Sequence, residues 1–189
     1  MAFSLNAGVC LAGDADEIVE RLKARYLKIT SIEAEFRQEV KSKAGLGAGG
    51  IADGKVFFKR PGKMRWIYSE TGDEIISNGK ILWFFQPELN QAIERPSDSG
   101  ITIATDFLSG IEGIGRDFDI SLKQGADDIY TLLLQPRKAM EGIKAVAIQV
   151  DKRDFFIKKT VVSDHLNNET TVEFKNIKTD AKIKDDFFE

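Results

Sequence analysis

Residues 55–86, KVFFKRPGKMRWIYSETGDEIISNGKILWFFQ, carry the sequence pattern that decides the fold. A strand can turn at the proline-glycine pair 61–62, and the returning segment places Met64 and Trp66 on one face with basic residues on the other. Two further apolar segments flank Asn78-Gly79, a pair typical of tight hairpins in which both central positions need positive φ. The stretch therefore predicts consecutive antiparallel hairpins.

Strand patterns also lie on both sides of this stretch. Residues 32–40 alternate apolar and charged side chains, which is typical of an antiparallel strand with one buried and one solvated face. A glycine-rich connection, 43–50, leads from there into the quoted hairpins. After a break at 96–116, strand patterns return at 118–122, 129–134, 143–150, 155–163 and 169–175. The sum is about ten antiparallel strands, and a meander is the simplest topology.

Two segments have helical rather than strand periodicity. Residues 14–28 place Ile18, Leu22 and Tyr26 at helical spacing, which predicts an amphipathic helix. Residues 101–109 can form a second, short helix before a glycine. A sheet this long should curl, and helices then cover its concave side. The expected fold is mainly β with α: an incomplete, open antiparallel β-barrel of about ten to eleven strands with a helical lid on its concave face.

The composition fits one globular domain. The 189 residues are 42% hydrophobic and 30% charged, with a net charge of −3, so nucleic acid is not an expected partner. Thirteen phenylalanines are more aromatic surface than such a core usually needs. We expect the domain to cover 14–189, with 1–13 as the remainder of a secretory signal or an added tail. No apolar stretch is long enough to span a membrane.

Residues that usually carry catalysis or bind metals are sparse. Cys10 is the single cysteine and His165 the single histidine, so neither an internal disulfide nor a usual zinc site is expected. The acidic pairs 127–128 and 185–186 lie in turn-like contexts, without a nucleophile, a histidine base or a phosphate-binding loop beside them. We therefore predict no enzymatic activity, no cofactor and no metal.

The order and spacing of the motifs resemble those of the LolA family of periplasmic lipoprotein carriers. The matching features are the aromatic strand that ends in Lys-Arg-Pro within 57–61, the return to Trp66, and the hairpin SNGKILW at 77–83. Looser likeness extends over most of the chain, in segments 31–40, 130–136, 143–151 and 176–187.

This resemblance implies a function as well as a fold. It implies a monomeric, periplasmic protein of a Gram-negative bacterium that encloses the acyl chains of lipoproteins. Its further partners would be an inner-membrane lipoprotein transporter complex and an outer-membrane lipoprotein receptor. The alternative is a LolA-like lipid-binding sensor or interaction domain that signals to a protein partner, because related domains share the barrel without carrying lipoproteins.

The resemblance and the pleat of the strands together suggest the residues of the cavity. Large aromatic side chains supply apolar area with little rotamer entropy to lose, which suits a cavity that is stable both empty and filled. The predicted hydrophobic cavity consists of Phe57, Met64, Trp66, Ile75, Trp83, Phe85, Phe107 and Leu108. An ordinary packed core is the alternative reading of these residues.

One arginine is expected to hold the lid closed. The resemblance implies this role for the arginine of the Lys-Arg-Pro motif, here Arg60. Its guanidinium group has five donors in a fixed arrangement, which can satisfy exposed carbonyl groups at a helix end. A surface arginine without this role is the alternative.

Overall fold

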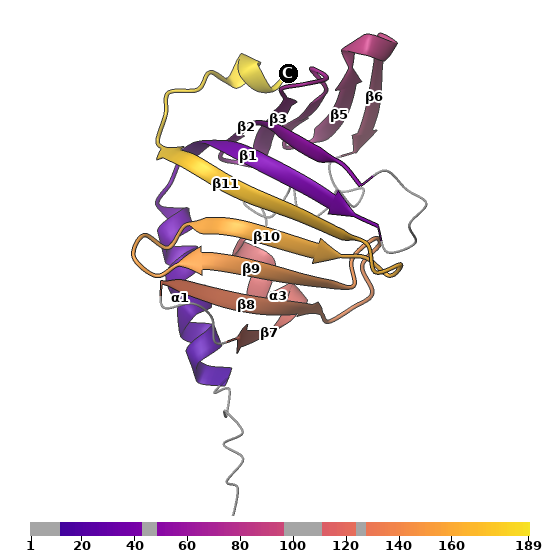
Figure 1. The fold of residues 1–189 in the computed structure, drawn as a ribbon. Helices are drawn as coiled ribbons and strands as arrows, with labels where there is room; N and C mark the ends of the chain where they lie inside the picture. Colours follow the sequence, from indigo (N-terminus) through magenta and orange to yellow (C-terminus); the bar gives the residue numbers. More distant parts are fainter. Residues whose placement is uncertain (1–11, 43–48, 97–110, 124–127) are drawn as a thin grey trace, which may run out of the picture.

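The structure, a computed structural model, describes residues 12–42, 49–96, 111–123 and 128–189. In these residues, eleven strands form one sheet in which every neighbouring pair is antiparallel. The order of the strands is β6-β5-β4-β3-β2-β1-β11-β10-β9-β8-β7, so the first and last strands along the chain meet in the middle. Strands β6 and β7 form the two edges, and the sheet is open (Figure 1).

The described part of the chain contains the following strands and helices. The strands are β1 Ser31–Lys41, β2 Ile51–Lys59, β3 Lys63–Tyr68, β4 Glu74–Asn78, β5 Ile81–Gln86, β6 Gln91–Pro96, β7 Phe118–Lys123, β8 Ile129–Pro136, β9 Ala145–Asp151, β10 Ile157–Ser163 and β11 Glu169–Thr179. The helices are α1 Ala12–Leu27, α3 Ile114–Asp117 and the short 3-10 helices η1 Pro87–Leu89, η2 Ile111–Gly113 and η3 Asp185–Phe188. The expected open antiparallel sheet of ten to eleven strands is confirmed.

One face of the sheet carries most of the hydrophobic core, and we call it the inner face. Strand pairing aligns Ala34, Val56 and Trp66 of three adjacent strands on this face, and all three are buried. Helix α1 packs against the same core with Ile18 and Leu22, which the helical spacing had indicated. In Figure 1, α1 and α3 lie against the part of the sheet that β7–β10 form. A single apolar face therefore explains both the curl of the sheet and the position of the helix.

The opposite, outer face is largely polar, but the end of the chain covers its β2–β4 part. Phe188 is fully buried there, and the ring of Phe187 packs at 4.9 Å from the ring of Phe57. Arg65 donates a hydrogen bond of 2.8 Å to the carbonyl oxygen of Phe187 and forms a 2.6 Å ion pair with Glu74. The C-terminal segment is thus part of the fold, and apolar side chains beneath it belong to a second, smaller core.

The hairpin at Asn78-Gly79 exists, but its turn differs from the predicted one. Only Gly79 of this pair has positive φ, at 89°. The side chain of Asn78 instead accepts hydrogen bonds from the backbone N–H groups of Lys80 and Ile81, both at 3.0 Å. Strand β4 ends at Asn78 and β5 begins at Ile81, so the two turn residues are Gly79 and Lys80. A tight turn with glycine at the first of these positions needs positive φ there alone.

Other segments also depart from the sequence prediction. The predicted strand 155–163 begins only at Ile157, because Phe155 has a left-handed φ of 56°. Strand β6 and the helices at 111–117 were not predicted, since their side chains show neither period clearly. The proposed lid helix 101–109 and nearly all of the proposed leading tail lie outside the described residues.

Adjacent leucines test the assignment of the two faces. Leu132 is fully buried on the inner face, whereas its neighbour Leu133 is 41% exposed on the outer face. We expect Leu132→Ala to lower the free energy of unfolding by about 2–5 kcal/mol, because it leaves a cavity in the core. The matched Leu133→Ala should cost less than about 1 kcal/mol. Urea denaturation of both variants measures the difference, and equal losses would contradict the assignment.

Candidate functional site

A groove of about 400 Å³ opens beside the strands β3–β6. The inner-face side chains that line it are Tyr68, Ile75, Phe84, Ile93 and Arg95, and it is bordered by Asp73, Glu74, Phe85 and Gln86. Cross-strand pairing aligns Ile75, Phe84 and Ile93 in one apolar row. The volume lies within the range of small-molecule pockets, and most of the lining is apolar, so the groove suits a hydrocarbon ligand.

Polar side chains also line this groove: Asp73, Glu74, Gln86 and Arg95, together with the hydroxyl group of Tyr68. The guanidinium group of Arg95 lies 5.9 Å from the centre of the Phe84 ring. Tyr68 donates its hydroxyl proton to the side-chain oxygen of Gln38 at 3.0 Å. Burial raises the pKa of Tyr68 to about 12, so this hydroxyl is neutral at physiological pH. The groove therefore combines an apolar row with two acidic side chains and one cationic side chain.

Three of the predicted cavity residues lie on the inner face. Met64 and Trp66 are buried in the core next to the groove, and Ile75 lines the groove itself. Phe107 and Leu108 fall outside the described residues. The groove residues Tyr68, Phe84 and Ile93 were absent from the prediction.

Three other predicted cavity residues lie on the outer face and not on the predicted concave face: Phe57, Trp83 and Phe85. Each follows or precedes another aromatic residue in its strand, so apolar alternation alone cannot decide which of the neighbours points inward. The register of the β2–β3 hairpin places Phe58, and not Phe57, opposite Met64. Phe85 still borders the groove through its position in β5. The turn length, which sets the register, is the signal that could have decided the face.

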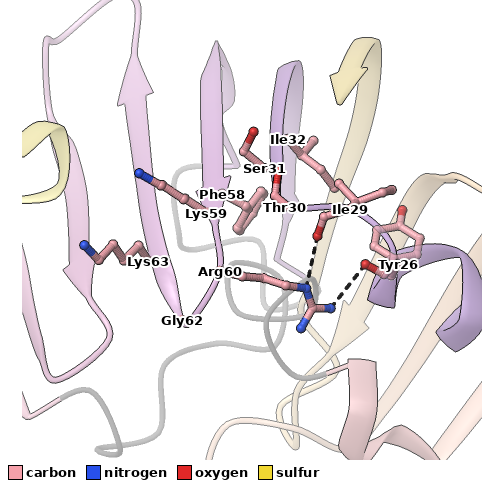
Figure 2. Close-up of a pocket in the computed structure, with 10 residues that line it drawn as sticks. All are labelled: Tyr26, Ile29, Thr30, Ser31, Ile32, Phe58, Lys59, Arg60, Gly62 and Lys63. Carbon is pink, nitrogen blue, oxygen red and sulfur yellow. Dashed lines mark hydrogen bonds between the residues drawn. The ribbon is translucent and has the colours of Figure 1, made fainter. Parts of the chain in front are cut away.

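Arg60 binds the end of helix α1. Its Nε donates to the carbonyl oxygen of Ile29 at 3.2 Å, and its Nη2 donates to that of Tyr26 at 3.3 Å (Figure 2). The backbone N–H of Arg60 also donates to the carbonyl oxygen of Thr30 at 2.9 Å. The last carbonyl groups of a helix have no partner within the helix and carry partial negative charge, so a cation stabilises them. The expected contact with helix-end carbonyls is present, at α1.

A small pocket of about 40 Å³ lies beside this arginine, at the junction of α1, β1 and the β2–β3 turn. Figure 2 shows Arg60 reaching from the turn toward Tyr26 and Ile29, while Lys59 and Lys63 point away from the helix. The pocket is too small for an acyl chain, because its volume is about one tenth of that of the groove. Arg60 is therefore a structural link here and not part of the groove.

Tyr26 attaches the same helix end to the far half of the sheet. Its hydroxyl oxygen accepts a hydrogen bond from the backbone N–H of Ile157 at 3.0 Å, and its ring packs edge-to-face on Phe156 at 6.1 Å. Burial raises the pKa of Tyr26 far above its usual value, so the hydroxyl stays protonated. Helix α1 is thus bound to strands on both sides of the centre of the sheet.

The described residues contain neither a cluster of metal-ligating side chains nor a membrane-spanning helix. Within that part of the chain, no three His, Cys, Asp or Glu side chains come together as a metal site would require. None of the helices described is long and apolar enough to cross a membrane.

The profile of the family described as outer membrane lipoprotein carrier protein LolA matches residues 27–189. The chain belongs to the LolA family. An outer-membrane lipoprotein carrier protein of Methylobacillus flagellatus is 25% identical to this LolA-family chain over 173 residues, which are 90% of this chain and 83% of the relative. LolA-family proteins are carriers without catalytic activity, and the prediction that this chain is not an enzyme is confirmed.

Solved structures share the fold of this LolA-family chain at low identity. The crystal structure of a LolA superfamily protein from Nitrosomonas europaea matches with a TM-score of 0.51 and 16% identity, over 93% of this chain and 97% of that one. MucB in the MucA/MucB complex of Pseudomonas aeruginosa matches with a TM-score of 0.51 and 13% identity, over 93% of this chain and 60% of that one. These likenesses concern the fold alone.

The Tyr26 hydroxyl provides a test of how α1 is attached. We expect Tyr26→Phe to lower the free energy of unfolding by about 1–3 kcal/mol, because the buried N–H of Ile157 loses its acceptor. The control Tyr68→Phe should cost only about 0.5–1.5 kcal/mol, since Tyr68 is partly exposed and water can replace its partner. Denaturant unfolding measures the free energy of unfolding of both variants. A larger loss of this free energy in Tyr68→Phe than in Tyr26→Phe would contradict this attachment.

Proposed function

We propose that this protein is a periplasmic carrier that binds the acyl chains of lipoproteins in the groove beside β3–β6. Membership of the LolA family supports the carrier role, since relatives such as that of Methylobacillus flagellatus bear the name of lipoprotein carriers. The observation that carries the proposal is the apolar row of Ile75, Phe84 and Ile93, which continues the buried inner face into an accessible groove.

A carrier must release its ligand, so part of the protein itself has to compete with the acyl chain for the apolar face. Burying one methylene group gains about 0.8 kcal/mol, so a fully enclosed long chain would approach ~10 kcal/mol and would be released slowly. If helices cover the inner face in the empty protein, the ligand must displace them, and only the difference appears as affinity. We propose that a long ligand extends from the groove along the inner face toward β7–β10 and there displaces α1, which Arg60 binds, together with the segment predicted at 101–109.

The proposed route begins at an inner-membrane lipoprotein transporter complex and ends at an outer-membrane lipoprotein receptor. A Gram-negative periplasm and a monomeric carrier are part of the same proposal. The carrier names of the relatives support this route. A transfer assay has to supply the transporter complex and the receptor.

A sensor or interaction domain is the second candidate. The observation in its favour is the shared fold with MucB, whose solved structure is a complex with MucA. A carrier exchanges a bound lipoprotein with acceptor vesicles that hold a receptor. A sensor instead changes its affinity for a protein partner when its acyl ligand is removed, so delipidation followed by both measurements separates the two.

A charge placed in the groove tests the ligand site. We expect Ile75→Asp to weaken binding of a triacylated lipopeptide by about tenfold or more, because a carboxylate in an apolar site costs more than 1.4 kcal/mol. The control Ile67→Asp changes a partly buried residue of β3 that lies on the outer face, and it should alter binding less than about twofold. Titration calorimetry measures both, and normal binding by Ile75→Asp would exclude this groove.

Loss of the Arg60 contacts tests the role of the helical cover. Arg60→Leu removes charged donors from the end of α1, which weakens the closed, empty form relative to the filled one. We expect the variant to release a bound lipoprotein about tenfold more slowly, a change of 1.4 kcal/mol. The control Arg37→Leu removes an arginine that pairs with Asp53 on the outer face. Transfer to acceptor vesicles is the measurement, and a normal rate in Arg60→Leu would refute the latch.

A further inference from the structure

The inner face buries a hydrogen-bond donor that has no acceptor. Among the described residues, two buried side-chain polar atoms lack a hydrogen-bond partner, the indole Nε1 of Trp66 and the hydroxyl oxygen of Thr160. Trp66 is fully buried. The other tryptophan, Trp83, donates its Nε1 proton to Oε2 of Glu94 at 3.1 Å. The indole N–H of the outer-face tryptophan, Trp83, therefore has an acceptor, whereas that of the inner-face tryptophan, Trp66, has none.

Aromatic rings surround Trp66 and do not replace an acceptor. The rings of Phe36, Phe58 and Phe174 lie 4.7, 6.1 and 6.1 Å from the Trp66 ring, in edge-to-face or tilted arrangements. The face of such a ring accepts a hydrogen bond only weakly. Buried polar groups are nearly always hydrogen-bonded, and an unsatisfied one calls for an explanation in each case. Phenylalanine would fill much of this site without a donor to satisfy.

The position of Trp66 connects it with the groove. Its cross-strand partner Ile75 lines the groove, and so does Tyr68, two residues further along β3 on the same face. Because Trp66 is fully buried, an acceptor can reach its N–H only when the side chains beside the groove move apart. A ligand that enters the groove between Tyr68 and Ile75 and moves these side chains apart would lie next to Trp66.

We infer that the indole N–H of Trp66 binds a carbonyl oxygen of the acyl anchor, that of an ester or amide link at the head of a fatty chain. The inference rests on the proposed function and specifies its ligand. A pure hydrocarbon leaves the donor unsatisfied, whereas a carbonyl group satisfies it and fixes how deep the chain enters. The site therefore selects acyl chains over alkanes of the same length.

The test compares two probes of similar length, methyl dodecanoate and tridecane, on the full chain and on Trp66→Phe. Titration calorimetry gives the affinities. We expect Trp66→Phe to bind methyl dodecanoate about 2- to 10-fold more weakly, the effect of one net hydrogen bond, and to bind tridecane unchanged. The control Thr160→Val removes the other unpartnered polar atom, four strands away from β3 in the sheet, and should leave both affinities unchanged.

An NMR measurement on the unmodified chain gives an independent answer if Trp66→Phe does not fold. The chain has two indole N–H signals. We expect methyl dodecanoate to move the Trp66 signal downfield and tridecane not to do so, while the signal of Trp83 stays in place with both. Equal loss of both affinities in Trp66→Phe, no loss of either, or an unmoved Trp66 signal would overturn the inference. If neither probe binds to the unmodified chain, the proposed function itself fails.

Discussion

Burial of one face only is the constraint on which this structure depends. Each strand places alternate side chains on opposite faces, and across eleven strands the apolar ones collect on the inner face. A sheet of this size with one apolar face has to curl and be covered. Helix α1 covers the part formed by β7–β10, and the apolar row at β4–β6 continues beyond it as a groove.

Helix α1 is held in place by polar contacts at its end, although the side chains that it buries are apolar. Leu22 and Ile18 supply the apolar area of α1, but this area alone does not fix where the helix ends. Arg60 and Tyr26 do so, because each makes a hydrogen bond of defined direction with backbone atoms of another element. These directional contacts therefore fix where the end of α1 lies on the sheet.

The outer face also carries apolar side chains, and the C-terminal segment covers them instead of a helix packed on the inner face. Phe57 and Ile76 lie on a face that is otherwise polar, and the C-terminal segment buries them with Phe187 and Phe188. Aromatic residues in this chain thus serve two cores. The number of aromatic residues indicates that a large apolar area is buried, but it does not show to which core a given ring belongs.

The sequence by itself determined the class of fold and the family. The two-residue period of 32–40 and the turn residues at 61–62 and 78–79 specify an antiparallel sheet, because such patterns depend on local geometry alone. The motif around Lys-Arg-Pro was specific enough to indicate the LolA family. Burial of Met64 and Trp66 also followed from alternation with basic neighbours.

Only the tertiary structure decided which aromatic residues lie on the inner face and which of them line the groove. Phe57-Phe58 and the run 83–85 are apolar without interruption, so a shift of one residue in register exchanges the two faces at no cost visible in the sequence. The partners of Arg60 and the missing acceptor of Trp66 were likewise decided by contacts between residues far apart in the chain. Such contacts depend on how whole helices and strands pack against one another, so a local sequence pattern cannot predict them.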